Sequence, residues 1–147
     1  MGETKTSKVG ERLLAKAKAT LPGFSSKGLS IEEGESLLER SVKLAVEARD
    51  NFWNSVKRNS GNRYRRALVA ASIGSYGAYL ADGSEYSGCY GPDVNLKELK
   101  DFHRRRLQVL IEAGPDLLAF ETIPNKLEAQ VFLIFCFLFS FSNKHVS

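Results

Sequence analysis

The sequence ALVAASI at residues 67–73 is an almost unbroken apolar run that leads into a loop rich in glycine and tyrosine, Gly74 to Val94. A run of this kind is typical of a strand in a parallel sheet whose two faces are both covered by helices. A helical segment and a second apolar run, Leu117 to Phe120, follow in the chain. The order strand, helix, strand predicts a parallel α/β unit. Glu121 comes at the carboxyl end of its second strand, where α/β folds place their functional groups.

Three segments carry a start signal for a helix, in which a short polar side chain is followed three positions later by glutamate. In such a capping box the polar side chain accepts from the amide of the glutamate, and the carboxylate accepts from the amide of the first residue. Apolar residues at three- and four-residue steps then predict one buried stripe on each helix, and Gly114-Pro115 predicts the end of the second helix. The pairs are Ser30 and Glu33, Asn95 and Glu98, and Asn125 and Glu128; the expected stripes contain Leu38, Val42, Ala45, Phe52 and Val56, and then Leu99, Phe102, Leu107, Leu110 and Ile111.

The loop from Gly74 to Val94 is about twenty residues long, which exceeds most connections in compact domains, so we expect it to be functional. Its glycines allow the backbone to approach a ligand closely, and its tyrosines offer flat apolar walls with a hydroxyl at the rim. The alternative for any one tyrosine is that its ring only fastens the loop to the body of the protein. No GxGxxG or Walker pattern is present, so a nucleotide phosphate is not the favoured ligand.

Glu121 is the strongest single candidate for a binding residue. A carboxylate at the carboxyl end of a parallel strand faces the side where substrates of barrel enzymes bind. There it can hold an ammonium group or orient a neighbouring residue. The alternative is a salt bridge to a neighbouring strand.

The composition is that of a globular protein in a reducing compartment. The chain has 147 residues, of which 43% are hydrophobic and 26% are charged, a balance typical of soluble proteins. Its two cysteines, Cys89 and Cys136, are too few for a disulfide framework, and no secretory signal opens the chain, so we expect a cytoplasmic protein. We expect no membrane partner, because the apolar run from Val131 to Phe141 is too short to cross a hydrocarbon core of about 30 Å.

The basic residues give a net charge of +4 and are spread along the sequence rather than gathered in a tail. Two groups stand out, the linker with Arg63, Arg65 and Arg66 and the run from His103 to Arg106. We expect both to be solvated surface, with His103 exposed because no partner lies three or four residues away, and we expect no nucleic-acid partner. Nucleic-acid binding through these groups is the alternative, and it predicts steeply salt-dependent retention on DNA or RNA.

Two motifs resemble one known family. Residues 72–86, SIGSYGAYLADGSEY, and residues 120–124, FETIP, resemble the homocysteine S-methyltransferase family in its plant and bacterial form. The similarity runs from about Ala19 through Gln130 and includes Gly23-Phe24 and the helix start at residues 28–30. It implies an α/β fold with parallel strands, here a partial (β/α)8 TIM-barrel fragment, because a full barrel takes about 250 residues.

The resemblance also implies a reaction. Family members move a methyl group from a sulfonium donor, S-methylmethionine or S-adenosylmethionine, to the sulfur of homocysteine, which gives methionine. They use a zinc ion held by three cysteines, because coordination to Zn²⁺ deprotonates the homocysteine thiol and the thiolate is the nucleophile. Attack on the methyl group then requires in-line placement of the two sulfurs. Homocysteine and the sulfonium donor are therefore the expected partners.

By the same resemblance, Glu121 is a homocysteine-binding carboxylate that meets the amino group of the substrate. The segment from Gly74 to Tyr79 belongs to the wall of the pocket. The expected substrate-binding residues are Glu121, Gly74, Tyr76, Gly77 and Tyr79. No catalytic residue and no metal ligand is predicted in this chain.

The sequence departs from the family pattern in several places. The glycine-rich first strand of the family, with its acidic residue, has no counterpart before Ala19, and neither the isolated zinc cysteine nor the cysteine pair is present. Ser75 replaces the usual proline of the loop, and an apolar segment follows Gln130. We therefore expect an unassigned segment at residues 1–18, a partial homocysteine-binding barrel domain at residues 19–130 and a divergent apolar tail at residues 131–147.

These departures predict a truncated chain that lacks the zinc ligands and is inactive by itself. Two parallel strands leave unpaired edges and uncovered helix faces, so we expect instability or aggregation unless the chain pairs with itself or with another barrel fragment. The alternative function is that of a non-catalytic fragment that binds or regulates full-length subunits.

Overall fold

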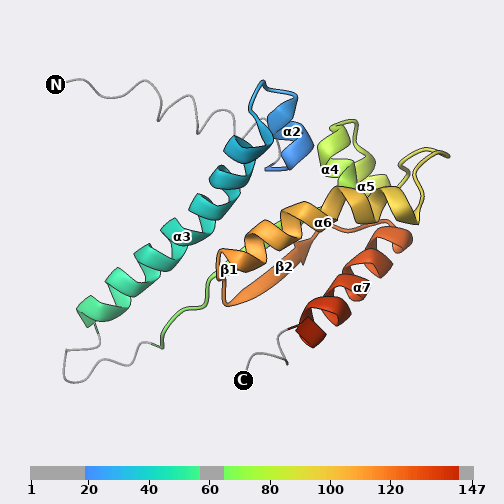
Figure 1. Cartoon of the computed structure of the whole chain (residues 1–147). Coiled ribbons are helices and arrows are strands. Elements are labelled where there is room, and N and C mark those ends of the chain that lie inside the picture. Colours follow the sequence, from blue (N-terminus) through green and yellow to red (C-terminus); the bar gives the residue numbers. More distant parts are fainter. Residues whose placement is uncertain (1–18, 57–64, 143–147) are drawn as a thin grey trace. The chain divides into compact units, whose positions relative to one another are not determined.

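The computed structural model describes residues 19–56 and 65–142 (Figure 1). The predicted segment at residues 1–18, part of the basic linker with Arg63, and the last five positions of the tail lie outside the described residues. The chain divides into two compact units, residues 1–73 with 106–119 and residues 74–105 with 120–147. The elements are α2 (Leu21–Ser25), α3 (Ile31–Val56), β1 (Ala70–Gly74), α4 (Tyr76–Leu80), α5 (Ser84–Ser87), α6 (Leu96–Glu112), β2 (Leu117–Glu121) and α7 (Lys126–Ser142).

The strands β1 and β2 pair in a two-stranded parallel sheet. The helices α4, α5 and α6 lie between them in the sequence, because parallel strands need a long crossover connection. The backbone N–H of Asp116 donates to the carbonyl of Val69 at 2.9 Å, directly before the two strands begin. The prediction of an α/β unit with parallel strands is therefore confirmed.

The expected burial of β1 on both faces is wrong for the described residues. Ala71 and Ile73 are buried, with exposed fractions of 5% and 0%, whereas Ala70 and Ser72 between them are exposed. Successive side chains of a strand point to opposite faces of the sheet. Only one face of the strand is therefore packed against other described residues, and the other face carries the small side chains of Ala70 and Ser72.

In the first unit, a short helix packs on a long one. Thr20 caps α2, its hydroxyl accepting from the N–H of Gly23 at 3.1 Å, and Phe24 of that helix is fully buried. A Cβ at Gly34 would lie 3.2 Å from the Phe24 ring, so the glycine lets α3 approach the ring closely. The capping box of α3 is confirmed, with the Ser30 N–H 2.8 Å from the Glu33 carboxylate and the Glu33 N–H 3.2 Å from the Ser30 hydroxyl.

The predicted stripe of α3 is only partly buried. Leu38 and Val42 have exposed fractions of 3% and 4%. Ala45 is exposed, and Phe52 keeps 55% of its surface accessible. The stripe therefore packs in the first half of the helix, and its continuation lacks a complete cover among the described residues.

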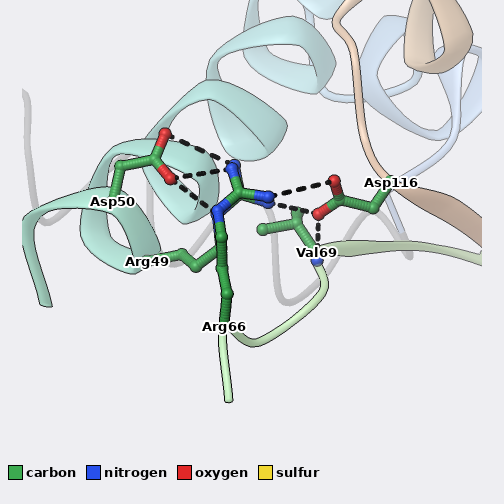
Figure 2. Close-up of polar contacts among 5 residues, drawn as sticks. All are labelled: Arg49, Asp50, Arg66, Val69 and Asp116. Carbon is green, nitrogen blue, oxygen red and sulfur yellow. Dashed lines mark hydrogen bonds and ion pairs between the residues drawn. The ribbon is translucent and has the colours of Figure 1, made fainter. Parts of the chain in front are cut away.

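Figure 2 shows a cluster of charged side chains in the first unit. Asp116 accepts from the backbone N–H of Val69 at 2.7 Å and from the guanidinium of Arg49. Arg49 and Arg66 also bind the Asp50 carboxylate, at 2.9 Å and 3.0 Å. The cluster ties α3 to the segments that lead into both strands, and it neutralises part of the basic charge predicted to be solvated.

In the second unit, the expected loop contains two short helices, α4 and α5, which Figure 1 shows in green beside each other. The hydroxyl of Ser75 accepts from the N–H of Ala78 at 3.3 Å and so caps α4. The capping box of α6 is confirmed, because Asn95 N–H lies 2.8 Å from the Glu98 carboxylate and the Asn95 side chain accepts from the Glu98 N–H at 3.2 Å. In the first unit, Gly114 lies in the connection between α6 and β2 and has a φ of 79°, the left-handed conformation expected of it.

The helix α7 continues through the apolar run to Ser142. Its buried residues recur at helical spacing, and its other face carries exposed Leu133, Phe137 and Leu138. No helix among residues 19–56 and 65–142 is long and apolar enough to span a membrane. Among residues 126–138 of α7, the buried ones are Glu128, Val131, Phe132 and Phe135.

Candidate functional site

The predicted site residues lie at and just beyond the carboxyl ends of the two strands. Gly74 is the last residue of β1, and Tyr76, Gly77 and Tyr79 lie on α4, which begins two residues later. Glu121 is the last residue of β2. In parallel α/β folds, ligands bind in the crevice outside this end of the strands. The local structure therefore places all five residues on the segments expected to carry a site.

Tyr76 and Tyr79 are brought together with Phe102 of α6. The Tyr76 and Tyr79 ring centroids lie 5.9 Å apart, and the Phe102 ring lies 4.9 Å from Tyr76 and 5.4 Å from Tyr79. Both tyrosines are half-buried. Aromatic rings in these tilted and edge-on arrangements stabilise one another beyond the burial of their area. The tyrosines thus fasten α4 to α6 and keep part of each ring accessible.

The two predicted glycines differ in their surroundings. A Cβ at Gly77 would lie 2.5 Å from the backbone nitrogen of Glu85, so Gly77 is needed for the close approach of α4 and α5. A Cβ at Gly74 would have its nearest neighbour, the Ala78 side chain, at 4.0 Å. A Cβ at Gly74 would therefore meet no close neighbour, and the contact of Gly74 with substrate, like that of Gly77, stays a prediction.

Glu121 is exposed and is followed by a strained residue. Its carboxylate takes part in none of the ion pairs found among residues 19–56 and 65–142. Thr122 has a φ of 52°, in the left-handed region that a β-branched residue rarely adopts. Such strain persists only where the surroundings enforce it, and it concentrates at functional sites. The turn after β2 is thus held in a conformation that the sequence disfavours, directly beside the candidate carboxylate.

A buried polar network is centred on Glu128 of α7. The Glu128 carboxylate is fully buried and accepts from the N–H of Tyr76 at 2.6 Å and from the hydroxyl of Tyr90 at 2.5 Å. His103 Nε2 lies 2.6 Å from Oε1 of the same carboxylate. Asn125 caps α7 by accepting from the Glu128 N–H at 3.1 Å. Glu128 therefore joins α4, α6, α7 and the intervening loop in one set of hydrogen bonds.

The prediction that His103 is a surface residue is wrong. Its side chain is fully buried and packs between Phe102 and Phe132, with ring centroids 4.7 Å and 4.5 Å away. Its partner, Glu128, lies 25 positions away in the sequence. The spacing of His103 from the buried residues Leu99 and Leu107 is the signal that could have placed it on the inner face of α6.

Burial changes the acidity of two tyrosines in this region. Desolvation raises the pKa of Tyr90 well above its usual range, and the hydrogen bond to Glu128 adds to the effect. Desolvation also raises the pKa of Tyr76, with smaller contributions from Tyr79 and Glu98. Both hydroxyls therefore stay protonated at neutral pH, and that of Tyr90 donates to the Glu128 carboxylate.

The described residues do not fit a metal centre. No group of three or more His, Cys, Asp or Glu side chains that could hold a metal ion occurs among residues 19–56 and 65–142. Cys89 and Cys136 are both exposed and free. Zinc held by thiolates requires several cysteines around one point. The zinc ligands expected of the resembled family therefore have no counterpart in this part of the chain.

Comparison with protein families gives a match to the model described as "Homocysteine S-methyltransferase", over residues 18–144. Homocysteine S-methyltransferase 1 of Arabidopsis thaliana is 80% identical over 112 residues, and that of Brassica oleracea var. italica is 79% identical over 112 residues. Each alignment covers 76% of this chain and 34% of the relative. The chain thus spans about a third of the length of these curated relatives.

A solved structure shows the same relationship. The homocysteine methyltransferase MmuM from Escherichia coli, in its metallated form, matches with a TM-score of 0.74 and 39% sequence identity. The match covers 86% of this chain and 41% of that protein. The likeness therefore extends over both the fold and the sequence of most of this chain.

Proposed function

Since this chain belongs to the homocysteine S-methyltransferase family, we propose that it forms the homocysteine-binding part of a methyltransferase barrel. The reaction proposed for the whole protein is methyl transfer from S-methylmethionine or S-adenosylmethionine to homocysteine, with methionine as product. The observation that carries the proposal is the likeness to the Escherichia coli homocysteine methyltransferase, with a TM-score of 0.74 at 39% identity. The two parallel strands are then part of a (β/α)8 barrel.

Glu121 is the proposed partner of the homocysteine amino group. Its carboxylate is exposed at the end of β2, and an ammonium group is the ligand that a carboxylate at such a position binds by a charge-assisted hydrogen bond. The half-buried rings of Tyr76 and Tyr79 offer apolar surface to the methylene groups of the substrate. Binding in this way orients the sulfur of homocysteine without contributing a catalytic group.

In the proposed reaction, the homocysteine sulfur attacks the methyl carbon of the sulfonium donor. A new carbon–sulfur bond forms as the old one breaks, the donor leaves as a neutral thioether, and the thiol proton passes to solvent. The task of this part of the protein is to hold homocysteine in line with the donor. No step is assigned to a metal here, because the described residues hold no suitable set of ligands.

The test is binding of homocysteine to the 147-residue chain, measured by isothermal titration calorimetry. We expect measurable binding and about a tenfold weaker dissociation constant for Glu121→Gln, since the variant loses one charge-assisted hydrogen bond. Glu47→Gln, an exposed glutamate of α3, is the matched control and is expected to bind like the unaltered chain. Equal affinity of the Glu121→Gln variant would contradict the proposed role of Glu121.

A second measurement addresses turnover. We propose that the chain alone binds homocysteine without transferring methyl groups, since the sequence contains only two cysteines. The assay follows methionine formation from S-methylmethionine and homocysteine with added zinc, and an intact family member is the positive control. Turnover close to that of the control would contradict this proposal.

The second candidate function is that of a non-catalytic fragment that binds full-length subunits. The exposed apolar side chains of α7, among them Leu133 and Phe137 with 69% of their surface accessible, favour it because such surface tends to be covered by another protein. Co-expression with an intact family member tests it. Recovery of both chains in one size-exclusion peak is expected, and separate elution would remove this candidate.

A further inference from the structure

Glu128 follows Asn125 at the spacing of a capping box, but its carboxylate does not close the box. In the matching pair on α6, the Glu98 side chain returns to the Asn95 N–H at 2.8 Å. At α7, the Glu128 carboxylate instead accepts from the amide of Tyr76 and the hydroxyl of Tyr90. The same Asn-x-x-Glu motif therefore adopts two structures, and in the second the glutamate carboxylate lies in the interior.

Such a burial is costly unless the charge is well hydrogen-bonded. Removing a carboxylate from water costs several kcal/mol, and only close partners offset that cost. Glu128 has three, the Tyr76 amide at 2.6 Å, the Tyr90 hydroxyl at 2.5 Å and His103 Nε2 at 2.6 Å. A glutamate that only caps a helix can keep its carboxylate at the surface, as Glu98 does. We therefore explain the burial of the Glu128 carboxylate by the groups that it holds in place.

The network holds the turn that follows β1. Tyr76 is the first residue of α4, so its N–H has no partner within the helix. Glu128 supplies that partner through Oε1 of its carboxylate, 2.6 Å from the Tyr76 nitrogen. Asn125 adds a second tie, because its amide donates to the carbonyl of Gly88 at 2.8 Å. The first turn of α7 thus fixes both ends of the segment that contains α4 and α5.

We propose that Glu128 is a positioning residue for the candidate homocysteine site, because its buried carboxylate fixes the backbone of Tyr76 at the end of β1. Tyr90 and His103 hold the carboxylate and do not touch substrate, since both are buried. The inference rests on the proposed function, in which Tyr76 and Tyr79 form part of the pocket wall. A loose turn would displace both rings, and a displacement of about 1 Å is enough to weaken a preorganised site.

The experiment uses the 147-residue chain and two readouts. The first is amide hydrogen exchange at Tyr76, which requires no substrate and reports whether Glu128 holds this N–H. The second is the dissociation constant for homocysteine. Glu128→Gln and Tyr90→Phe are expected to speed exchange at Tyr76 by about tenfold and to weaken homocysteine binding by about tenfold. Glu47→Gln, at an exposed position of α3, is expected to change neither.

Two substitutions of His103 separate the loss of its hydrogen bond to Glu128 from the loss of packing volume. His103→Gln keeps an N–H donor that reaches the carboxylate, whereas His103→Leu keeps only apolar volume. We expect the His103→Gln variant to stay within about threefold of the unaltered chain and the His103→Leu variant to weaken binding by about tenfold. Should the Glu128→Gln variant fail to fold, as judged by circular dichroism, the Tyr90→Phe variant and the His103 pair decide the question.

The outcomes distinguish the two proposals. Absence of homocysteine binding by the unaltered chain overturns the proposed function and with it the substrate role of the network. Unchanged exchange at Tyr76 in the folded Glu128→Gln or Tyr90→Phe variant overturns the positioning role alone. Equal binding by the His103→Gln and His103→Leu variants overturns it as well.

Discussion

The hydroxyl of Tyr90 donates to the carboxylate of Glu128 at 2.5 Å, between two side chains with exposed fractions of 8% and 0%. This contact joins the loop after α5 to the first turn of α7. A hydrogen bond to a buried carboxylate contributes more than one between neutral groups. The contact therefore makes Tyr90 a stability determinant as well as a partner of Glu128.

We predict that Tyr90→Phe lowers the free energy of unfolding by about 2 kcal/mol, because the carboxylate loses a donor that water cannot replace. Urea unfolding followed by circular dichroism measures the change. Tyr86→Phe is the matched control, since the Tyr86 side chain is 79% exposed, and its effect should lie within about 0.5 kcal/mol. Equal effects of the two substitutions would contradict the prediction.

The same contact predicts a dependence on alkaline pH. Burial raises the pKa of Tyr90 above its ordinary value of 10.0, so the folded state keeps the phenol proton when the unfolded state has lost it. The stability that this shift contributes is fully present below pH 10 and declines as the pH rises from there toward the folded pKa. We expect the advantage of the unaltered chain over the Tyr90→Phe variant to shrink above pH 10. A constant difference from pH 8 to pH 11 would contradict the assignment.

The cluster in Figure 2 contributes to the dependence of stability on acid pH. The hydrogen bond from Arg49 holds the pKa of Asp50 below its ordinary value of 3.8, and Arg66 adds to the effect. The contribution to stability is therefore present above pH 3.8 and is lost as the pH falls through the folded pKa. Asp50→Asn should flatten the fall in stability below about pH 4, whereas Asp93→Asn, at an exposed loop position, should leave it unchanged. Thermal unfolding at a series of pH values measures both.

The local features of the fold were predictable from sequence because their determinants lie within one turn of helix. The capping boxes at Ser30 and Asn95 form as expected, with both hydrogen bonds of each box present. The left-handed Gly114 is likewise a local requirement. Three or four neighbouring residues are enough to specify such structures, so no tertiary information is needed.

The candidate site was only partly predictable, because its support is nonlocal. Asn125 and Glu128 have the same pattern as Asn95 and Glu98, yet only the structure shows that Glu128 turns inward to His103, 25 positions away. Glu121 lies at the end of β2 as expected, since a strand end is a local property, whereas residues 76–80 of the expected loop form the helix α4. The pairing of a buried histidine with a buried glutamate depends on helix packing, which a single local pattern does not encode.

Gly77 of α4 and Gly74 at the end of β1 provide a further prediction. Gly77→Ala places a Cβ 2.5 Å from the backbone nitrogen of Glu85, and backbone cannot move aside cheaply, so we expect a loss of about 1–3 kcal/mol in stability. Gly74→Ala, whose Cβ would have its nearest neighbour at 4.0 Å, is the control for folding and should change stability by less than about 1 kcal/mol. Calorimetric melting compares the two. A larger loss for the Gly74→Ala variant would show that the packing of α4 has been misassigned.

Substitutions of Thr122 test whether the strained turn beside Glu121 serves the candidate site. Its φ of 52° disfavours a β-branched side chain, whereas asparagine adopts the left-handed region readily. Thr122→Asn should therefore raise the free energy of unfolding by about 1 kcal/mol. Thr122→Val keeps the branched Cβ and should give no such gain. If the strain serves to aim the Glu121 carboxylate, the Thr122→Asn variant gains stability without tighter binding of homocysteine. Loss of stability in the Thr122→Asn variant would instead show that the threonine hydroxyl, rather than the backbone, fixes the turn.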